Sequence, residues 1–325
     1  MFDLSFGNSV CVREAFVKAS LGNPIQFGNE ELLRFDYPSH EGDPKLVEIT
    51  RSVIKRQIGT DYKHVFITNG ATGGVTAALM TYKLRGVDYC HTRNAPYYAR
   101  YPEIIKSAGM IHNDETFIQL QRESVWLLDT PSNPLGELKS PNIKPEIPVI
   151  LDAVYLNNVY TAFTIGIPAH NVLVGSYSKL LGINGIRLGW IATNDDSLAK
   201  ELKAVITSQY CGLSVASTEI LKHYMVGFNW EQFEQSARMK LDYNREEWAQ
   251  LEKYFHNEPV KMHGMFYYAP FDKKCRELLT KAGIKWTVGQ TMGTSEDYGR
   301  INLGQDNDLI AKAVEAILKA DRIRK

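Results

Sequence analysis

One lysine has neighbours that suit a bound anion. Lys179 follows the apolar run 171–176, with Ser176 and Ser178 before it and glycines and Arg187 after it. Hydroxyl groups and the planar guanidinium of an arginine match a phosphate group. A lysine amine whose pKa is lowered by burial and by neighbouring cations can form a Schiff base with a carbonyl compound. The segment predicts covalent chemistry at Lys179 beside an anion site.

Two further segments supply groups that complete such a site. Asp152 ends the apolar run 148–152, and Tyr155 follows three residues later. A glycine-rich turn at 68–74 joins a strand-like run to a helical one, which directs backbone N–H groups at an anion. We expect three residues of this turn at the anion: Gly70, Ala71 and Thr72.

These segments together resemble a known family. The string 176–189 resembles the S-x-S-K-x-x-G-x-x-G-x-R-x-G signature of the pyridoxal-phosphate (PLP) enzymes of aminotransferase class I/II, which have the aspartate-aminotransferase fold (fold type I). Residues 152–155 resemble its D-x-x-Y motif. Residues 130–136 resemble its N-P-x-N-P-x-G loop, with Thr130 in place of the first Asn and Leu135 in place of the usual Thr. The resemblance spans roughly residues 5–305.

The resemblance implies a role for each matching residue. Lys179 would hold PLP as a Schiff base, Asp152 would face its ring nitrogen, and Tyr98 of the segment 96–101 would stack on its ring. Tyr155 and Asn133 would contact its phenolic oxygen. The phosphate would be held by Gly70, Ala71, Thr72, Ser176, Ser178, Arg187 and Tyr37 of the partner subunit. The substrate carboxylate would be bound by Arg300, Asn133 and Gly7.

Short apolar runs followed by turn residues indicate the fold class. They lie at 64–68, 125–129, 148–152 and 171–176, and helical periods such as 75–84 separate some of them. This alternation is typical of an α/β protein with a largely parallel sheet and a ligand at the carboxyl ends of its strands. The resemblance implies a large domain with a mostly parallel seven-stranded sheet between helices, plus a small α+β domain.

The pattern changes after Trp190. Residues 197–226 are helical in pattern, and Asn229 with Gln232 forms a capping box that opens a long helix. Its apolar positions are Trp230, Phe233, Ala237, Leu241, Trp248, Leu251 and Phe255. A small α+β unit follows, with strands at 265–270 and 300–304 and helices at 273–283 and 306–322. We predict a large domain at 35–228, an interdomain helix at 229–256, and a small domain from 1–34 and 257–325.

One stretch departs from the family pattern. Residues 137–146 include Pro141 and Pro145 and can hardly hold the crossover helix that parallel strands usually need. We expect an irregular connection there. A similar shortening occurs in the alliinase and plant tryptophan-aminotransferase branch, which the blocks 95–103 and 127–138 also resemble.

Composition excludes several other classes of function. The 37 Lys and Arg balance the 37 Asp and Glu, so no net charge favours nucleic acid or a membrane surface. No apolar stretch is long enough to span a membrane, and the N-terminus lacks the features of a secretory signal. The four cysteines and eight histidines show neither CxxC nor HExxH spacing. We expect no metal, free thiols and a cytoplasmic location.

The resemblance implies a PLP-dependent aminotransferase that moves the amino group of an L-amino acid to a 2-oxo acid through Lys179. No second arginine occupies a recognisable motif for a distal carboxylate, so an apolar or aromatic amino acid is favoured as the substrate. Arg13 and Arg100 stay open as partners of a side-chain carboxylate. We expect a homodimer with a shared active site. Two alternatives remain open: a C–S lyase of the alliinase type, which performs β-elimination, and a non-catalytic PLP-fold regulatory protein.

Overall fold

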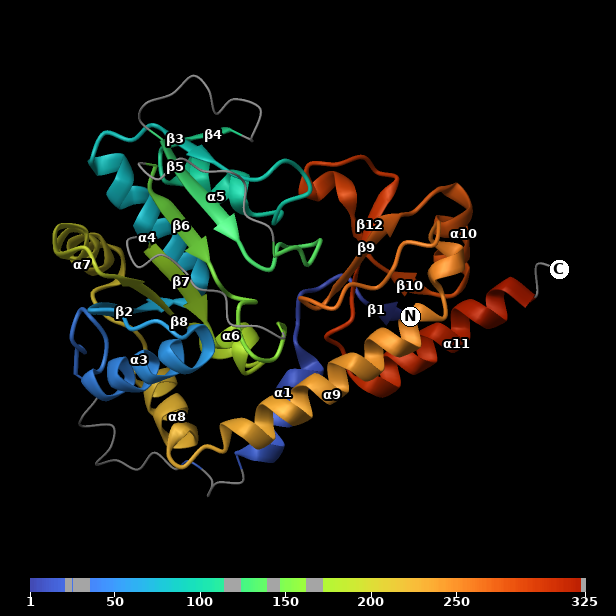
Figure 1. Cartoon of the computed structure of the whole chain (residues 1–325), viewed down its shortest axis with the longest axis horizontal. Helices are drawn as coiled ribbons and strands as arrows, with labels where there is room; N and C mark the ends of the chain where they lie inside the picture. The colour runs from blue at the N-terminus through green and yellow to red at the C-terminus, as the bar shows by residue number, and fades with distance from the viewer. Residues whose placement is uncertain (21–24, 26–35, 114–123, 139–146, 162–171, 323–325) are drawn as a thin grey trace.

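A seven-stranded sheet forms the centre of the larger part of the molecule (Figure 1). The structure is a computed structural model, and it describes residues 1–20, 25, 36–113, 124–138, 147–161 and 172–322. Its strand order is β2-β8-β7-β6-β5-β3-β4. The strands are β2 His64–Asn69, β3 Tyr89–His91, β4 Ile111–Asn113, β5 Ser124–Asp129, β6 Val149–Asp152, β7 Val172–Ser176 and β8 Leu188–Thr193. β8 is antiparallel to both neighbours, and the other pairs are parallel. The predicted mostly parallel seven-stranded sheet is confirmed.

Both faces of this sheet are buried. Val125 and Leu127 of β5 belong to one core cluster, whereas Trp126 and Leu128 belong to another. The helices of this part of the chain are α3 Pro44–Ile58, α4 Gly70–Leu84, α5 Tyr101–Ser107, α7 Asp196–Tyr210 and α8 Val215–Met225. α4 packs on β6, β7 and β8, and α7 packs on α4. Burial on both faces explains why the strands are continuous apolar runs in the sequence.

The sheet places three polar residues at one edge. β5, β6 and β7 are parallel neighbours, and they end at Asp129, Asp152 and Ser176. The short helix α6, Tyr177–Leu180, begins directly after β7, and Ser176 caps it by accepting the backbone N–H of Ser178 at 3.0 Å. Ligands of such sheets bind at the carboxyl ends of the strands.

A second, smaller part of the chain lies beside this edge (Figure 1). Its antiparallel sheet has the order β11-β12-β9, and β1 pairs in parallel with β10. Its elements are β1 Phe2–Asp3, β9 Phe266–Pro270, α10 Lys273–Lys281, β10 Ile284–Lys285, β11 Thr287–Val288, the 3₁₀ turn η4 Gly289–Met292, β12 Tyr298–Asn302 and α11 Asn307–Arg322. The sequence predicted β9, β12, α10 and α11, but not the two-residue strands.

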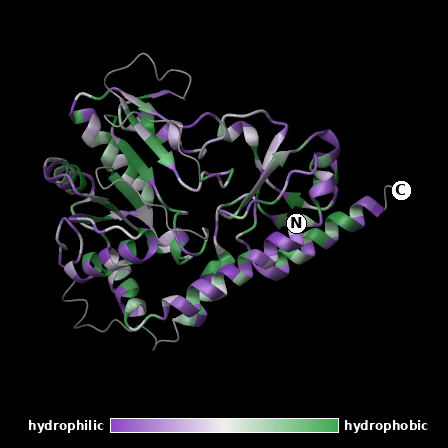
Figure 2. Cartoon of the chain, in the orientation of Figure 1, coloured by the Kyte–Doolittle hydropathy of each residue, from purple (hydrophilic) through white to green (hydrophobic). Residues whose placement is uncertain are grey.

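The helix α9, Trp230–Ala249, contributes to two cores. Asn229 accepts the backbone N–H of Gln232 at 3.1 Å, as its predicted capping role requires. The first half of α9 supplies Phe233, Ala237 and Leu241 to the core that includes α1 Val10–Ala19, whereas Trp248 belongs to the core of the smaller part. Figure 2 shows mixed hydropathy along α9 and α11 and mostly hydrophobic central strands.

Three predictions about organisation differ from the structure or are untested by it. The long helix ends at Ala249 rather than Phe255, and the 3₁₀ turn η3, Glu252–Tyr254, follows it. The irregular connection expected at 137–146 falls mostly on 139–146, outside the described residues. The division into domains at 35–228, 229–256, and 1–34 with 257–325 stays a prediction.

Candidate active site

A cavity of about 620 Å³ opens at the edge where β5, β6 and β7 end. The N-terminal loop 5–8 and residues of β10, β11 and β12 close its other side. The cavity is lined by twelve of the fourteen residues that the sequence predicts for the site: Gly7, Ala71, Thr72, Tyr98, Asn133, Asp152, Tyr155, Ser176, Ser178, Lys179, Arg187 and Arg300. The fold brings together residues from nearly the whole length of the chain.

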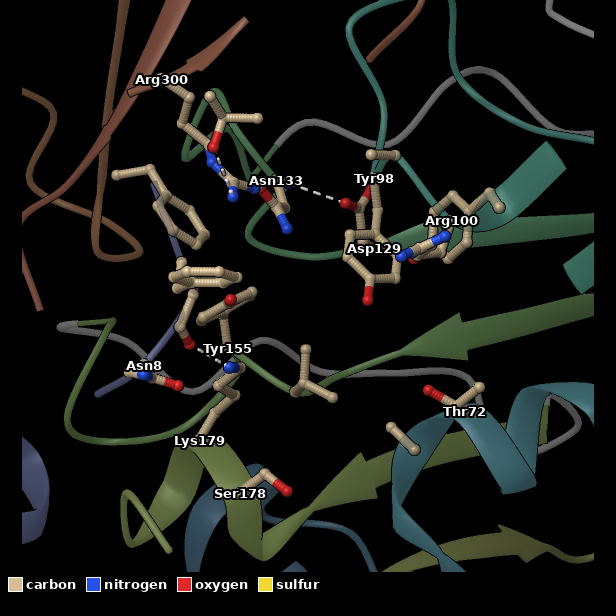
Figure 3. A pocket seen from close by; sticks show the side chains of 18 of the residues that line it. Asn8, Thr72, Tyr98, Arg100, Asp129, Asn133, Tyr155, Ser178, Lys179 and Arg300 are labelled. Carbon is tan, nitrogen blue, oxygen red and sulfur yellow. Dashed lines mark hydrogen bonds between the residues drawn. The ribbon is translucent and has the colours of Figure 1, made fainter. Parts of the chain in front are cut away.

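Lys179 lies on α6, at the base of the cavity, and its Nζ donates a hydrogen bond to the carbonyl oxygen of Gly7. Burial lowers the pKa of this amine to about 8, and the nearby cations Arg300 and Arg187 act in the same direction. Asp152 opposes them. Figure 3 shows Lys179 and Tyr155 in one cluster of side chains at the cavity. The amine is thus partly neutral at mildly alkaline pH, as a nucleophile must be.

An anion-binding corner lies beside this lysine. Ala71 and Thr72 in the first turn of α4 line the cavity, where the helix N-terminus offers free backbone N–H groups. Arg187 donates from Nη1 to Ser178 Oγ at 3.4 Å and to the carbonyl of Asn184 at 3.0 Å. An amine of lowered pKa, a helix N-terminus and a guanidinium together match a phosphorylated carbonyl compound.

Gly70 does not line the cavity, but its backbone lies against the guanidinium of Arg187. Its φ is +66°, and a Cβ at this position would lie 2.5 Å from Arg187 Nη2. Any larger residue would displace the guanidinium. The predicted contact of Gly70 with the anion stays a prediction.

The carboxylate of Asp152 lies at the end of β6 and is buried. It accepts hydrogen bonds from Tyr101 Oη at 3.1 Å and from the backbone N–H of Val154 at 3.2 Å. Burial raises its pKa to about 7, and the charge of Asp129 adds to this effect. Burial also raises the pKa of Asp129 to about 6.

Aromatic rings form two walls of the cavity. Tyr98 meets Tyr101 edge to face, with ring centroids 5.3 Å apart. Tyr155 meets Phe266 edge to face at 5.8 Å. Burial raises the pKa of the Tyr98 and Tyr155 hydroxyls, so both remain protonated at neutral pH. Each hydroxyl can therefore donate a hydrogen bond to an anionic oxygen.

Arg300 connects the small sheet to the large one. It donates from Nη1 to Asn133 Oδ1 at 3.0 Å, and from Nη2 to the Ser5 carbonyl at 3.2 Å and to Thr287 Oγ1 at 3.3 Å. Its guanidinium carbon lies 4.2 Å from the centre of the Phe266 ring. Its Nε is buried without a hydrogen-bond partner. A buried donor without a partner is costly, and a bound carboxylate would satisfy it.

Tyr37 lies apart from these residues. It is 89% exposed and does not line the cavity of its own chain. Its expected contact with a partner subunit stays a prediction.

Sequence reasoning missed other residues of the cavity. Asp129, Asn184, Phe266, Trp286 and the loop residues Ser5, Phe6 and Asn8 line it as well. Asp129 had a signal, because it ends the apolar run 125–129, as Asp152 ends 148–152. Ser5, Phe6 and Asn8 had none of their own, because contacts with distant residues such as Asn302 hold this loop at the site.

The residues present fit PLP. The cavity is of ordinary size for a cofactor site. It combines an amine of lowered pKa, an anion-binding corner, a buried carboxylate and an arginine with a free Nε donor.

Two further observations concern metal binding and membrane-spanning helices. One group of three possible metal ligands was found among the described residues, at His256, Asp272 and Cys275. Each has a protein contact: His256 Nε2 lies 3.2 Å from Asp272, and Cys275 Sγ donates to the Tyr254 carbonyl at 2.5 Å. Within the described ranges, no helix combines the length and apolar character that a membrane span requires.

Two relatives of known assignment align with the chain. The tryptophan aminotransferase-related protein 1 of Oryza sativa subsp. japonica is 27% identical over 186 residues, which cover 52% of this chain and 40% of that protein. The (5-formylfuran-3-yl)methyl phosphate transaminase of Methanocaldococcus jannaschii is 25% identical over 305 residues, 84% of this chain and 79% of that protein. The chain thus spans less than half of the rice protein it matches and about four fifths of the archaeal one.

Solved structures share the fold. A Thermus thermophilus aspartate aminotransferase double mutant superposes with a TM-score of 0.78 at 15% identity, over 98% of this chain and 91% of that one. Bna3p, a putative kynurenine aminotransferase of Saccharomyces cerevisiae, gives 0.79 at 16% identity, over 99% and 91%. The model of the family described as aminotransferase class I and II matches residues 11–317. Because this match covers nearly the whole chain, the protein belongs to the aminotransferase class I and II family, and membership implies PLP as its cofactor.

Proposed function

We propose that this protein is a PLP-dependent aminotransferase that moves the amino group of an L-amino acid, with an apolar or aromatic side chain favoured, to a 2-oxo acid. One observation supports this above the others. A lysine amine with a pKa of about 8 and an arginine with a buried, unpartnered Nε open into the same cavity. These are the two groups that covalent chemistry on an amino acid needs: an amine that reacts with a carbonyl, and a guanidinium whose N–H groups hold a carboxylate.

We assign the cofactor contacts as follows. The phosphate is held by the first turn of α4, by Ser178 and by Arg187, while Ser176 supports this corner by capping α6. Asp152 faces the ring nitrogen, and Tyr98 stacks on the ring. Asn133 and Tyr155 contact the phenolic oxygen. When bound, PLP supplies a carbonyl carbon that receives the amino group and a ring that accepts electrons from the substrate Cα.

Lys179 is the proton carrier of the reaction. Its Nζ, neutral in part at mildly alkaline pH, accepts the proton of the substrate Cα as a general base. Arg300 and Asn133 hold the substrate carboxylate, which fixes the orientation of Cα toward that amine. The carbonyl oxygen of Gly7 accepts a hydrogen bond from Lys179 Nζ, which holds this amine in place at the cavity.

The side-chain preference is supported by the far wall of the cavity. Phe6, Phe266 and Trp286 line it, together with Val288. Lys285 also lines it, but its ammonium is 3.0 Å from Asp3 and lies over the Phe6 ring. An apolar or aromatic side chain buries its surface there without leaving a charge unpaired.

Assembly and location are part of the proposal. We infer a homodimer in which Tyr37 of the partner subunit reaches the phosphate, and its high exposure in the single chain supports this. All four cysteines are free, which supports a cytoplasmic location.

The test is a screen of the twenty amino acids against the PLP-loaded protein. The proposal expects at least one apolar or aromatic amino acid to convert bound PLP into pyridoxamine phosphate with release of the matching 2-oxo acid. Added 2-oxo acid then restores PLP. Release of pyruvate and ammonia without an acceptor would show the C–S lyase instead, and no conversion with any amino acid would favour the regulatory protein.

A further inference from the structure

A second carboxylate lies beside Asp152 and has no part in the reaction described above. β5 and β6 are parallel neighbours, and their register pairs Asp129 with Asp152. Register partners on adjacent strands point to the same face of the sheet, and the strands are about 4.8 Å apart. Asp129 is 4% exposed and Asp152 is 7% exposed. Two carboxyl groups are therefore withdrawn from water side by side at the cavity.

The surroundings compensate the negative charges of these two carboxylates only weakly. Asp129 Oδ2 accepts the backbone N–H of Asn133 at 2.7 Å, a bond drawn in Figure 3. Among the described residues, one cation lies within ion-pair distance of either carboxylate: Arg93, whose Nε is 3.9 Å from Asp129 Oδ1. This Nε makes no hydrogen bond.

Asp152 is surrounded by weaker partners. Tyr101 Oη and the backbone N–H of Val154 donate to it. Lys179 favours its ionised form through space, whereas Asp129 opposes it. Tyr98 lies close enough for its ionisation to be opposed by Asp152. Two like charges on neighbouring strands, whose backbones are about 4.8 Å apart, disfavour ionisation of both groups. Such a pair therefore loses its two protons in separate steps.

We propose that Asp129 and Asp152 form a carboxyl pair that shares one proton at neutral pH, and that this pair, not Asp152 alone, faces the ring nitrogen of the cofactor. The statement about the ring nitrogen rests on the proposed function, whereas the shared proton does not. Asp129 is a positioning residue here, because it acts through Asp152. When a ring nitrogen takes the proton, one carboxyl O–H bond breaks and one N–H bond forms. Two carboxylates then face two cations, the ring and Arg93.

The burial-raised pKa values of both carboxyls agree with this geometry. A pair with one proton supplies a donor and an acceptor at the same place. A nitrogen heterocycle can therefore be bound in its protonated form over a wider pH range than a single carboxylate allows.

The first experiment uses the protein without PLP. Carbon-13 NMR of protein labelled at the aspartate side-chain carboxyl carbons follows each titration, and Asp129→Asn and Asp152→Asn assign the two signals. In the wild type, one carboxyl should titrate near neutral pH. Asp129→Asn should lower the midpoint of Asp152 by about one pH unit or more, because the neighbouring charge is removed. An unchanged midpoint overturns the proposal.

Two further variants complete this experiment. Asp61→Asn is the matched control, since Asp61 is an exposed carboxylate paired with Lys55, and it should leave the Asp152 midpoint unchanged. If Asp129→Asn does not fold, Arg93→Gln replaces it. Removal of this cation should raise the pair's upper midpoint, and an unchanged midpoint again overturns the proposal.

The second experiment uses PLP labelled with nitrogen-15 in its ring, whose chemical shift reports protonation of the ring nitrogen directly. The bound ring should lose its proton about one pH unit or more lower in Asp129→Asn than in the wild type. Equal values contradict the part of the proposal that concerns the ring. If PLP does not bind to the wild type, the proposed function fails, and the titration without PLP still decides whether the carboxyls share a proton.

Discussion

Arg300 Nη1 donates to Asn133 Oδ1 at 3.0 Å, and this bond joins β12 of the small sheet to the loop that follows β5 of the large one. The two residues lie 167 positions apart in the chain. Their contact places a guanidinium and an amide at one corner of the cavity, with the Arg300 Nε still unpartnered. A carboxylate bound there would contact residues of both the large and the small sheet.

The first prediction concerns this corner. Arg300→Ala should lower kcat/KM for an amino acid roughly 30- to 4000-fold, because loss of one partner of a buried charge pair costs about 2–5 kcal/mol. PLP binding should survive, since the proposal gives Arg300 no contact with the cofactor. Steady-state kinetics on an amino acid and on its decarboxylated amine make the comparison.

The amine is the control for this prediction, and its kcat/KM should hardly change. Arg300→Lys should recover only part of the lost kcat/KM, since a lysine keeps the charge but lacks the two parallel N–H donors of a guanidinium. Equal losses on the amino acid and the amine would mean that the carboxylate is bound elsewhere.

The second prediction concerns Gly70. Gly70→Ala should weaken PLP binding about tenfold or more, because its Cβ would lie 2.5 Å from Arg187 Nη2 and would displace the guanidinium that holds the phosphate. Fluorescence titration with PLP measures the dissociation constant.

Gly73→Ala is the matched control on the same helix. A Cβ there would have its nearest neighbour at 3.4 Å, and the backbone of Gly73 has no positive φ. Its affinity for PLP should stay near that of the wild type. Similar losses in both variants would show that the loss of affinity in Gly70→Ala does not act through Arg187.

The third prediction is a pH dependence. The neutral amine is the reactive form of Lys179, so the rate of PLP uptake should rise with pH through a midpoint of about 8. The pKa of Lys179 is lower in the folded protein than its ordinary value of 10.5. Its contribution to stability is therefore unfavourable below pH 8 and diminishes as the pH rises from 8 toward 10.5.

Stopped-flow absorbance between pH 6 and about 10.5 measures this uptake. Arg300→Ala should move the midpoint upward, because a neighbouring cation is removed. A wild-type midpoint near the ordinary lysine value would contradict the lowered pKa.

The fourth prediction tests the shared active site. A hybrid dimer of one Tyr37→Phe subunit and one Lys179→Ala subunit has one site that lacks both groups and one that lacks neither. Such hybrids should show about half of the wild-type activity per dimer. If Tyr37 served its own subunit, or if a dilute monomer were fully active, the hybrid would be no better than the Tyr37→Phe dimer.

The chemistry-bearing strands were predictable, whereas some contacts between them were not. β5, β6 and β7 are apolar runs that end in polar residues, and this pattern is local. The pairing of Asp129 with Asp152 depends on strand order and register, which no local pattern specifies. An aspartate at the end of a strand is also a common turn residue, so the local pattern at Asp129 did not by itself indicate a place in the site.

Two other differences have equally physical causes. The apolar spacing of Trp248, Leu251 and Phe255 continues past the end of α9, because a 3₁₀ turn buries these side chains in the same core. Sequence periodicity therefore predicted a longer helix. The carbonyl of the loop residue Ser5 accepts from Arg300, and the loop is held there by the pairing of β1 with β10 and by hydrogen bonds from Thr287 and Asn302, all of them contacts between the two ends of the chain.

The central claim is that Lys179 is the residue that binds PLP covalently. Reduction of the PLP-loaded protein with borohydride, followed by peptide mass spectrometry, tests it most directly. The account predicts a single phosphopyridoxyl group, on the peptide that contains Lys179, and none in Lys179→Ala. Lys285 lines the same cavity. Label on Lys285 in the wild type, or no label on any lysine, would contradict the account.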